Sequence, residues 1–292
     1  NFIEKIKKQP DKAEQVLDKI KTDGFLPTIK AVNSKLESSI PLGYSNVGKV
    51  IAVGREVSGF KIGDRVVSNG SHAEVVSVPQ NLCAIIPEDI KDADAAFAVL
   101  SSVGLQAVRL AKPEFSETFL VIGLGLIGLL TVQILKANGC KVLAYDIDTS
   151  KCEIAKKLGI NAESFINKTD AINWCIEENG TKGIDGVIIT ASTNSTSPVE
   201  IAASVSRKKG RIILVGVTGL DIKRDWFYKK ELSFQVSCSY GSERYDEDYQ
   251  SSRKEYPIGI YRWTTKRNFE SVLESISNGQ IKTDLLKTNK YL

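Results

Sequence analysis

Residues 118–148 read TFLVIGLGLIGLLTVQILKANGCKVLAYDID, and this stretch decides the fold. Residues 119–122 form a short apolar run that ends at a glycine, which is typical of a buried parallel strand. Residues 126–137 are apolar nearly all round, as a helix buried against a sheet should be, and Asn138-Gly139 ends that helix. Residues 141–145 then form a second strand. The stretch therefore predicts a strand, a glycine turn, a helix and a strand in succession.

The glycine turn has the spacing G-x-G-x-x-G, which is a weak signal on its own. Here it follows a strand and opens a helix, and an acid follows the second strand at about the 20-residue spacing of dinucleotide-binding folds. The first glycine allows the tight turn, the second lets the backbone approach a pyrophosphate, and the third lets helix and strand pack closely. We therefore favour a dinucleotide site over an ordinary glycine-rich turn. Its predicted residues are Gly123, Gly125, Leu126, Ile127 and Gly128.

The acid after the second strand, Asp146, also chooses the cofactor. A carboxylate accepts hydrogen bonds from two ribose hydroxyls but repels a 2′-phosphate, so the sequence favours NAD(H) over NADP(H). Lys151 follows in the next helix. It could contact the adenosine edge of the cofactor or be an ordinary solvated lysine.

Length and composition set broader limits. A chain of 292 residues favours two domains, and a hydrophobic content of 42% with 25% charged residues is ordinary for a globular protein. We find no apolar run of about 18 residues free of turn signals, and the opening residues are polar, so neither a membrane span nor a signal peptide is expected. The net charge of +4 is modest. Residues 207–209 are basic, and we expect them in a solvated loop; nucleic-acid binding is not suggested.

The five cysteines are scattered, odd in number and without a C-x-x-C pair. This pattern argues against a disulfide framework or a structural zinc lobe and fits a reducing cytoplasm. The chain begins at Asn1 and contains no methionine. We interpret this as a sign that the chain is a fragment or that residues are missing from within it.

The pattern of apolar and polar residues changes on either side of residues 118–148. Residues 3–21 and 28–36 pattern as amphipathic helices, and residues 41–79 alternate valine and isoleucine with polar residues and glycine turns, as in a small irregular β-barrel. Residues 92–112 are helical. Helices and strands then alternate, which predicts a parallel, doubly wound sheet. The strands are expected at 164–166, 186–190, 211–215 and 232–237, and the helices at 151–158, 170–178, 198–205 and 269–278.

Ligands of such sheets bind beyond the carboxyl ends of the strands. The loops expected there include residues 237–241 and two dipeptides that follow buried strands. We predict that these dipeptides contact the dinucleotide; they are Ala191, Ser192, Val215 and Gly216.

Three motifs accompany the glycine turn: GYSNVGKVIAVG at 43–54, VSGFKIGDRV at 57–66 and HAEVVSVP at 72–79. With this set, the chain over residues 41–240 resembles the medium-chain dehydrogenase/reductase superfamily, which comprises the zinc alcohol dehydrogenases and their zinc-free relatives. The resemblance implies an oxidoreductase with a small-molecule substrate, and homodimers as a family habit.

The resemblance also implies the fold class and the domains. The fold would be α/β, with a Rossmann doubly wound parallel sheet at 101–240 that binds NAD. A chaperonin-10-like β-barrel, the catalytic domain, would occupy residues 1–100. That domain is incomplete, and residues 241–292 would return to complete it.

Five stretches carry a closer resemblance: residues 9–24, PLGYSNVG at 41–48, SNGSHAEVVSVPQNLCA at 68–84, SCSYGSERYD at 237–246 and YPIGIYRWTTKRN at 256–268. They are similar to the N-terminal dehydrogenase half of bacterial two-domain oxidoreductases, in which it is fused to an inositol-dehydrogenase-like domain. The resemblance implies a role in surface-polysaccharide sugar synthesis. The fused domain, which would be a partner, is absent from this chain.

The sequence departs from the zinc enzymes where the metal would bind. Those enzymes carry His-Glu after the glycine of the first motif, and this chain has Tyr44-Ser45 after Gly43. The cysteine-rich lobe that should follow Arg65-Val66 is missing. One histidine in the whole chain cannot supply a catalytic site of the Cys/His kind, so we expect no zinc.

Without a metal, a side chain must exchange the hydroxyl proton during hydride transfer. Tyr44 occupies the position of the absent ligand histidine. His72 is the only histidine, the side chain that ordinarily titrates near neutrality. Each has a structural alternative: Tyr44 as a buried tyrosine that donates to backbone, and His72 as a cap of the turn at Asn69-Gly70.

Five further residues are candidates for ligand contacts. Ser102, in the helix before the glycine turn, could pack beside the nicotinamide or simply in the core. The others could grip a sugar-nucleotide diphosphate, since guanidinium groups pair with phosphate, or could form an ordinary charged surface. They are Arg244, Tyr245, Arg262 and Lys266.

The leading hypothesis is thus an NAD-dependent dehydrogenase that acts on a hydroxyl of a sugar or similar polar alcohol. A zinc-free quinone or enoyl reductase is the first alternative; such enzymes usually prefer NADPH, which Asp146 argues against. A nucleotide-binding partner domain without catalysis is the second alternative.

Overall fold

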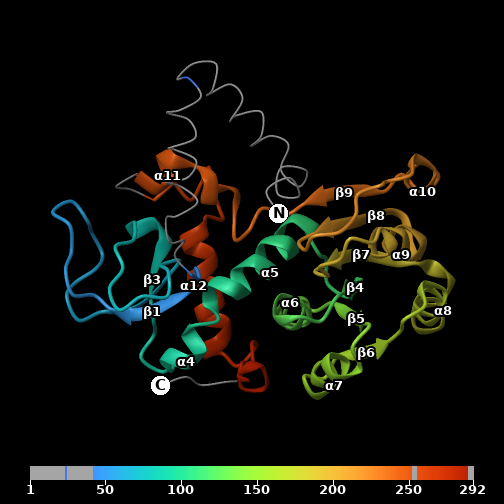
Figure 1. Cartoon of the computed structure of the whole chain (residues 1–292), viewed down its shortest axis with the longest axis horizontal. Coiled ribbons are helices and arrows are strands. Elements are labelled where there is room, and N and C mark those ends of the chain that lie inside the picture. Colours follow the sequence, from blue (N-terminus) through green and yellow to red (C-terminus); the bar gives the residue numbers. More distant parts are fainter. Residues whose placement is uncertain (1–23, 25–41, 252–254, 289–292) are drawn as a thin grey trace. The chain divides into compact units, whose positions relative to one another are not determined.

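The computed structural model describes residue 24 and residues 42–251 and 255–288 (Figure 1). The chain divides into two compact units, residues 1–42 and 43–292, and only the second is described in detail. The helices predicted at 3–21 and 28–36 lie outside the described residues. The predicted domain boundaries at 100 and 240 stay a prediction.

The larger sheet is parallel and has six strands in the order β6-β5-β4-β7-β8-β9. Numbered from β4, this order is 3-2-1-4-5-6, that of the Rossmann fold, and the strand order reverses between β4 and β7. The predicted doubly wound sheet is therefore confirmed. The strands are β4 (Thr118–Ile122), β5 (Lys141–Asp146), β6 (Asn161–Ser164), β7 (Ile184–Ile189), β8 (Ser206–Leu214) and β9 (Ser233–Val236).

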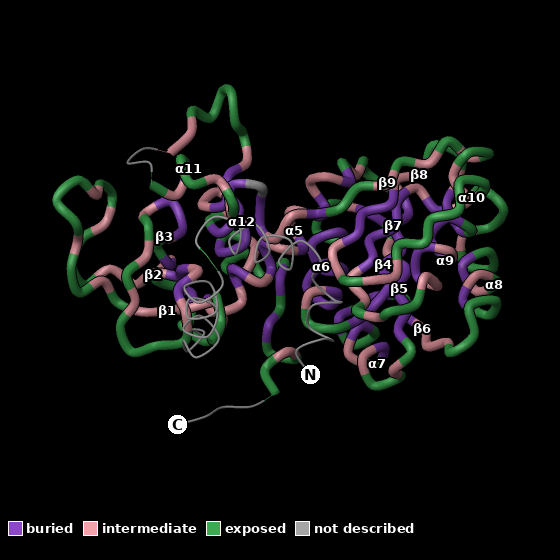
Figure 2. Tube along the Cα trace, turned by 45° about the horizontal axis from the view of Figure 1, so that its top comes forward, coloured by how far each residue is buried: buried purple, intermediate pink, exposed green. Residues whose placement is uncertain are grey.

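Successive residues of a strand point to opposite faces of the sheet, and here an apolar cluster covers each face. In β4, Phe119 and Val121 pack into one apolar cluster and Leu120 and Ile122 into another. In Figure 2 the central strands β4 and β7 are coloured almost wholly as buried. Each large apolar side chain buried there contributes about 1.5–3 kcal/mol to folding. The first cluster contains residues of α5 (Ala98–Ala111), α6 (Leu126–Ala137) and α7 (Thr149–Lys157), and the second those of α8 (Lys168–Asn179) and α9 (Ser197–Val205).

The smaller sheet is antiparallel and has the order β1-β2-β3. Its central strand pairs on both sides: Val67 lies opposite Val47 of β1 and opposite Ala84 of β3. Helix α12 packs against both β3 and α5 (Figure 1). The elements outside the parallel sheet are β1 (Asn46–Lys49), β2 (Arg65–Ser68), β3 (Cys83–Ile85), α4 (Asp92–Ala95), α10 (Arg224–Tyr228), α11 (Glu247–Ser251) and α12 (Thr265–Ser277), with short 3-10 turns at Gln80–Leu82, Gly180–Lys182, Ser242–Tyr245 and Asp284–Leu286.

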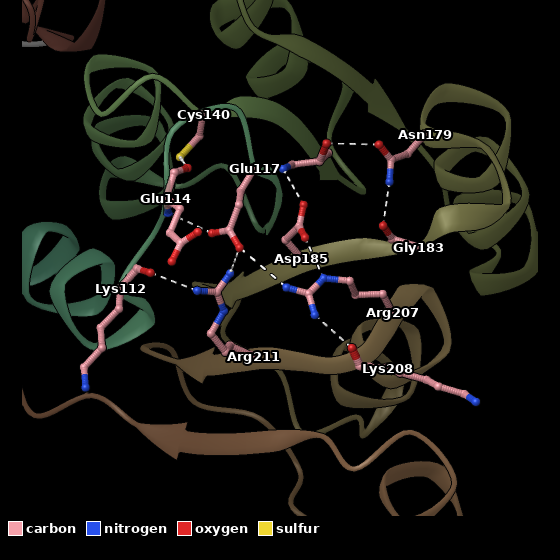
Figure 3. Close-up of polar contacts among 11 residues, drawn as sticks. Lys112, Glu114, Glu117, Cys140, Asn179, Gly183, Asp185, Arg207, Lys208 and Arg211 are labelled. Carbon is pink, nitrogen blue, oxygen red and sulfur yellow. Dashed lines mark hydrogen bonds and ion pairs between the residues drawn. The ribbon is translucent and has the colours of Figure 1, made fainter.

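A network of charges joins neighbouring strands at the amino edge of the parallel sheet (Figure 3). Arg207 Nε donates to Asp185 Oδ1 at 2.6 Å, and its guanidinium lies 3.5 Å from Glu117. Arg211 also pairs with Glu117. The prediction of a solvated loop at 207–209 is therefore wrong for Arg207: these residues begin β8, and Arg207 is held by carboxylates beside it. The hydrogen bond from Arg207 to Asp185 raises the pKa of Arg207.

One stretch of the described chain, residues 92–111, is long and apolar enough to span a membrane by length and composition. It comprises α4 and α5. Ala107, Val108 and Ala111 of α5 are buried in the first apolar cluster, and α5 packs against α6 and α12. Burial in the core is therefore a sufficient reason for its apolar character.

Candidate functional site

The three glycines of the turn have three different surroundings. Gly123 has a φ of +98°, and a Cβ there would lie 2.6 Å from the backbone nitrogen of Ala191. A Cβ on Gly128 would lie 2.0 Å from the carbonyl oxygen of Gly123, so only glycine lets α6 pack this closely. A Cβ on Gly125 would meet nothing within 4 Å. Gly125 therefore faces open space, as a residue that a pyrophosphate approaches must.

Helix α6 begins at this turn with its first backbone N–H groups unpaired. Its N-cap is Gly125, which supplies no side-chain hydrogen bond. The N–H groups of Leu126 and Ile127 precede the first intrahelical bond, which Leu129 donates to the Gly125 carbonyl. These donors, together with the positive end of the helix dipole, suit a phosphate group.

Asp146 lies at the end of β5, and only 8% of its surface is exposed. Its Oδ2 accepts a hydrogen bond from the backbone N–H of Leu124, inside the glycine turn, at 2.6 Å. Its Oδ1 accepts from the N–H of Asp148 at 3.0 Å and lies 3.7 Å from Lys151 Nζ. Each oxygen keeps a lone pair for a further donor, such as a ribose hydroxyl. Lys151 is thus placed beside two carboxylates, since Asp148 also lies 3.8 Å from its Nζ.

The loops predicted at the carboxyl ends of the strands lie together. The N–H of Ala191 donates to the Ile122 carbonyl of β4 at 3.0 Å, and the N–H of Gly216 donates to the Ile189 carbonyl of β7 at 3.0 Å. A Cβ on Gly216 would lie 2.0 Å from the carbonyl oxygen of Ala191. Ser192 forms a bridge with the residue after Gly216. Val215 and Gly216 therefore share one edge of the sheet with the glycine turn, as do Ala191 and Ser192.

Thr190 also belongs to this edge, although the sequence did not single it out. Its hydroxyl donates to the Gly123 carbonyl at 2.5 Å and fixes the turn to the end of β7. Ser102 is placed differently. It is buried on α5, and its hydroxyl donates to the Ala98 carbonyl of the same helix at 2.8 Å. This contact favours the packing alternative for Ser102.

The two candidate proton-exchanging residues lie on neighbouring loops of the smaller sheet. Tyr44 is half exposed, at 50%. The imidazole of His72 lies directly against Gly43: a Cβ on Gly43 would be 2.2 Å from its Nε2. Asn46 Nδ2 donates to the carbonyl of Ser71 at 3.2 Å and holds the two loops together. The structure therefore brings His72 beside the residue that precedes Tyr44.

Tyr240, in the loop after β9, joins this group and was missed in the sequence. It is 1% exposed, and its hydroxyl accepts a hydrogen bond from Asn69 Nδ2 at 3.0 Å. Burial raises the pKa of Tyr240, while the Asn69 hydrogen bond and the nearby Arg244 oppose the rise; the Tyr44 phenol adds to it. The only sequence signal for Tyr240 was its place in a loop beyond a strand end.

The four predicted substrate residues do not form one cluster. Arg244 lies 5.6 Å from the ring of the exposed Tyr245, and this pair neighbours Tyr240. Arg262 stacks instead on Trp263 at 3.7 Å. Lys266 lies over the ring of Phe60 at 5.0 Å.

The described residues do not fit a zinc ion. The single histidine and all five cysteines lie in the described part of the chain, and the cysteines are free. No three His, Cys, Asp or Glu side chains within that part gather as a metal site would require. A tetrahedral site needs three or four such ligands, and the described residues alone do not assemble them.

Two family models match the chain. "Zinc-binding dehydrogenase" matches residues 127–253, and "Alcohol dehydrogenase GroES-like domain" matches residues 18–88. The sorbitol dehydrogenase of Bacillus subtilis (strain 168) is 23% identical over 299 residues, which cover 89% of this chain and 83% of that protein.

Solved structures with the same fold differ in the activities that they are named for. Galactitol-1-phosphate dehydrogenase from Escherichia coli has a TM-score of 0.68 at 22% identity and covers 84% of this chain and 75% of its own. A mycobacterial quinone oxidoreductase has a TM-score of 0.67 at 19% identity and covers 85% and 75%. The two family matches, the Rossmann strand order and the glycine turn agree, and the chain belongs to the medium-chain dehydrogenase/reductase superfamily.

Proposed function

We propose that this protein is an NAD(H)-dependent, zinc-independent oxidoreductase that acts on a hydroxyl or carbonyl of a polar alcohol. The observation that carries the proposal is the buried Asp146 carboxylate, which closes on the glycine turn at the Leu124 N–H. A fixed negative charge at this position accepts ribose hydroxyls and repels a 2′-phosphate. The family's alcohol and polyol dehydrogenases supply the reaction class.

NAD supplies a hydride acceptor at its nicotinamide ring when it is bound. Gly125 and the first N–H groups of α6 would hold its pyrophosphate, and Asp146 its adenosine ribose. Oxidation of a secondary alcohol to a ketone sends the C–H hydride to the nicotinamide and the hydroxyl proton to a base. We assign that base to His72, with Tyr44 beside it as the relay or the substrate contact.

We propose a sugar or nucleotide sugar as the substrate, in a surface-polysaccharide pathway of a reducing cytoplasm. The side chains near the Tyr240 hydroxyl are polar and include one cation: Asn69 donates to it, and Tyr44, Tyr245 and Arg244 lie close enough to affect its pKa. Such a lining suits several hydroxyl groups and an anionic group. The free cysteines agree with a reducing compartment.

A zinc-free quinone reductase is the second candidate. It is favoured by the absence of a metal-ligand group among the described residues and by the shared fold of the mycobacterial quinone oxidoreductase. A quinone reductase would prefer NADPH and an apolar pocket. The charge of Asp146 argues against NADPH, and the polar side chains near the Tyr240 hydroxyl argue against an apolar pocket. A binding domain without catalysis would bind the dinucleotide and turn over nothing.

Fluorescence titration with NADH and NADPH, followed by an NAD⁺ assay with a panel of polyols, sugars and nucleotide sugars, tests the proposal. We expect tighter binding of NADH and turnover of at least one alcohol, which His72→Ala abolishes and Tyr44→Phe reduces. Tyr228→Phe is the control, because Tyr228 is also exposed but lies on α10, before β9. Preference for NADPH with quinone reduction would favour the second candidate, and NADH binding without turnover the third.

A further inference from the structure

Tyr240 contacts three parts of the molecule that come from distant positions in the sequence. Its ring packs against Phe269 of α12 with centroids 5.4 Å apart. Its carbonyl accepts a hydrogen bond from Asn268 Nδ2 at 3.0 Å, and Asn268 Oδ1 in turn accepts from Arg109 of α5 at 2.8 Å. The tyrosine is therefore held rigidly at both its backbone and its ring, and its hydroxyl has a fixed position.

The fixed hydroxyl meets the loop that carries His72. Asn69 follows β2 and donates its side-chain N–H to Tyr240 Oη at 3.0 Å. Three other contacts hold this loop: the N–H of Asn69 donates to the Leu82 carbonyl at 3.3 Å, the N–H of Gly70 donates to Ser68 Oγ at 3.2 Å, and the carbonyl of Ser71 accepts from Asn46. All three come from the small sheet or from the turn that precedes β3. Tyr240 is the contact that ties the loop to an element following the parallel sheet.

Tyr240 lies beyond the carboxyl end of β9, on the side of the parallel sheet on which the nicotinamide would bind. A dinucleotide crosses the sheet edge at the point where the strand order reverses, here between β4 and β7. Asp146 at the end of β5 takes the adenosine half. The other half then extends over the ends of β7, β8 and β9, and the loop after β9 contains Tyr240.

We propose that Tyr240 is a positioning residue that acts through Asn69: it sets the loop Asn69–His72, and with it the imidazole, against the reacting end of the cofactor. This inference rests on the proposed function for its catalytic consequence. The hydroxyl accepts a hydrogen bond from Asn69 Nδ2, and Tyr240 itself is buried, so this contact fixes the Asn69 side chain from inside the protein. Misplacement of a catalytic group by about 1 Å can cost up to 100-fold in rate, so a contact of this kind affects turnover more than binding.

The test uses a property of this chain: His72 is its only histidine, so its NMR signal needs no assignment by mutation. Protein labelled with ¹³C at histidine Cε1 is compared as wild type, Tyr240→Phe, Asn69→Ala and the double variant. The matched control is Tyr249→Phe, which removes the hydroxyl of another fully buried tyrosine, bonded to the Asn81 carbonyl. NADH affinity and, where turnover exists, kcat and KM are measured on the same samples.

We expect Tyr240→Phe and Asn69→Ala each to shift or broaden the His72 signal, with no further change in the double variant. The value of kcat should fall about tenfold in each, with NADH affinity within twofold of wild type. An unmoved His72 signal in Tyr240→Phe, or an equal change in Tyr249→Phe, would overturn the inference. If no substrate is turned over, the proposed function fails, while the NMR comparison still decides the role of Tyr240. Asn69→Ala keeps the test valid should Tyr240→Phe not fold.

Discussion

The carboxylate of Asp146 has two neighbours that the sequence motif does not reveal. Its Oδ2 is bonded to the glycine turn at Leu124 N–H, and its Oδ1 faces Lys151. The first contact ties the end of β5 to the turn after β4 and fixes the carboxylate before any ligand arrives. Such preorganisation lowers the entropic cost of binding.

Asp146→Asn tests whether charge, rather than shape, selects the cofactor. The amide keeps an acceptor for the Leu124 N–H but loses the negative charge, so NADH binding should weaken about tenfold and NADPH binding should strengthen. Fluorescence titrations with both dinucleotides measure the ratio. Asp148→Asn is the control, because Asp148 caps α7 through Ser150 N–H and its side chain is 44% exposed. An unchanged ratio in Asp146→Asn would contradict the electrostatic account.

Single residues were predictable where their role is local in the sequence. Gly123, Gly128 and Asp146 lie within one strand-turn-helix-strand unit, and the structure gives the two glycines the close backbone neighbours that the motif predicts. Tyr240 was missed because its partner Asn69 lies 171 positions away. The role of Arg207 was misjudged for the same reason, since Asp185 belongs to another strand.

At the scale of elements, the turn and α6 give a paired prediction from two glycines. Gly125→Ala adds a methyl group into open space at a φ of −63°, so the melting temperature should stay within a degree or two while dinucleotide affinity falls at least tenfold. Gly128→Ala forces a Cβ against the Gly123 carbonyl and should lower stability by about 1–3 kcal/mol. Thermal melts with and without NADH separate the two effects. Equal loss of stability in both variants would contradict the assigned roles.

The short helix α11 gives a prediction on acid stability. Asp246 Oδ1 accepts from the N–H of Tyr249 at 3.0 Å, and Oδ2 accepts from the Tyr256 hydroxyl at 2.7 Å. The Tyr249 N–H, followed by the Tyr256 hydroxyl, lowers the pKa of Asp246. The unfolded chain therefore binds the proton more readily, so this contribution is complete above about pH 4 and is lost as the pH falls through the lowered pKa.

Melting temperatures between pH 6 and pH 3 test this sign. The wild type should lose stability through this range, and Asp246→Asn should start lower and lose less. Asp248→Asn is the matched control, because Asp248 is exposed and lies in the first turn of α11, two residues after Asp246. If the melting temperatures of wild type and Asp246→Asn fell in parallel with pH, the carboxylate would contribute nothing to the loss of stability in acid.

The predicted boundaries of helices and strands agree best with the observed ones where the element is buried on one face or on both. Helix α6 spans the predicted residues 126–137, and β4 and β5 differ from their predictions by one residue. The strand β6 is Asn161–Ser164 rather than 164–166. It is a partly exposed edge strand, and its position is set by pairing with β5 rather than by its own apolar pattern.

For the molecule as a whole, the order of the strands could be predicted from the sequence, whereas the set of side chains that comes together near His72 could not. Alternating helices and strands permit few topologies, and the observed order is the one that a Rossmann fold requires. The group around His72, in contrast, combines Tyr44, Asn69 and Tyr240 from three loops. Its geometry depends on contacts between the small sheet and the loop after β9, which have no local signal.

Metal content is the property of the whole protein that most sharply tests this account, because a family model that matches the chain is described by zinc binding. Within the described residues the single histidine and the free cysteines are not gathered with other ligands. Dialysis against a strong chelator should therefore leave turnover, melting temperature and NADH affinity unchanged. Elemental analysis of the purified protein should find well under about 0.1 zinc per chain, against the one per chain of a catalytic zinc site.

The control for this prediction is to add Zn²⁺ back to the dialysed protein. Added Zn²⁺ should raise neither turnover nor melting temperature, because a site that binds only the folded state would stabilise it by about 2.7 kcal/mol at a hundredfold excess over its Kd. Near-stoichiometric zinc, with activity lost to the chelator and restored by Zn²⁺, would require ligands outside the described residues. His72 would then be a ligand or a neighbour of the metal rather than the proton acceptor, and the same single-histidine NMR signal would report it by shifting on metal removal.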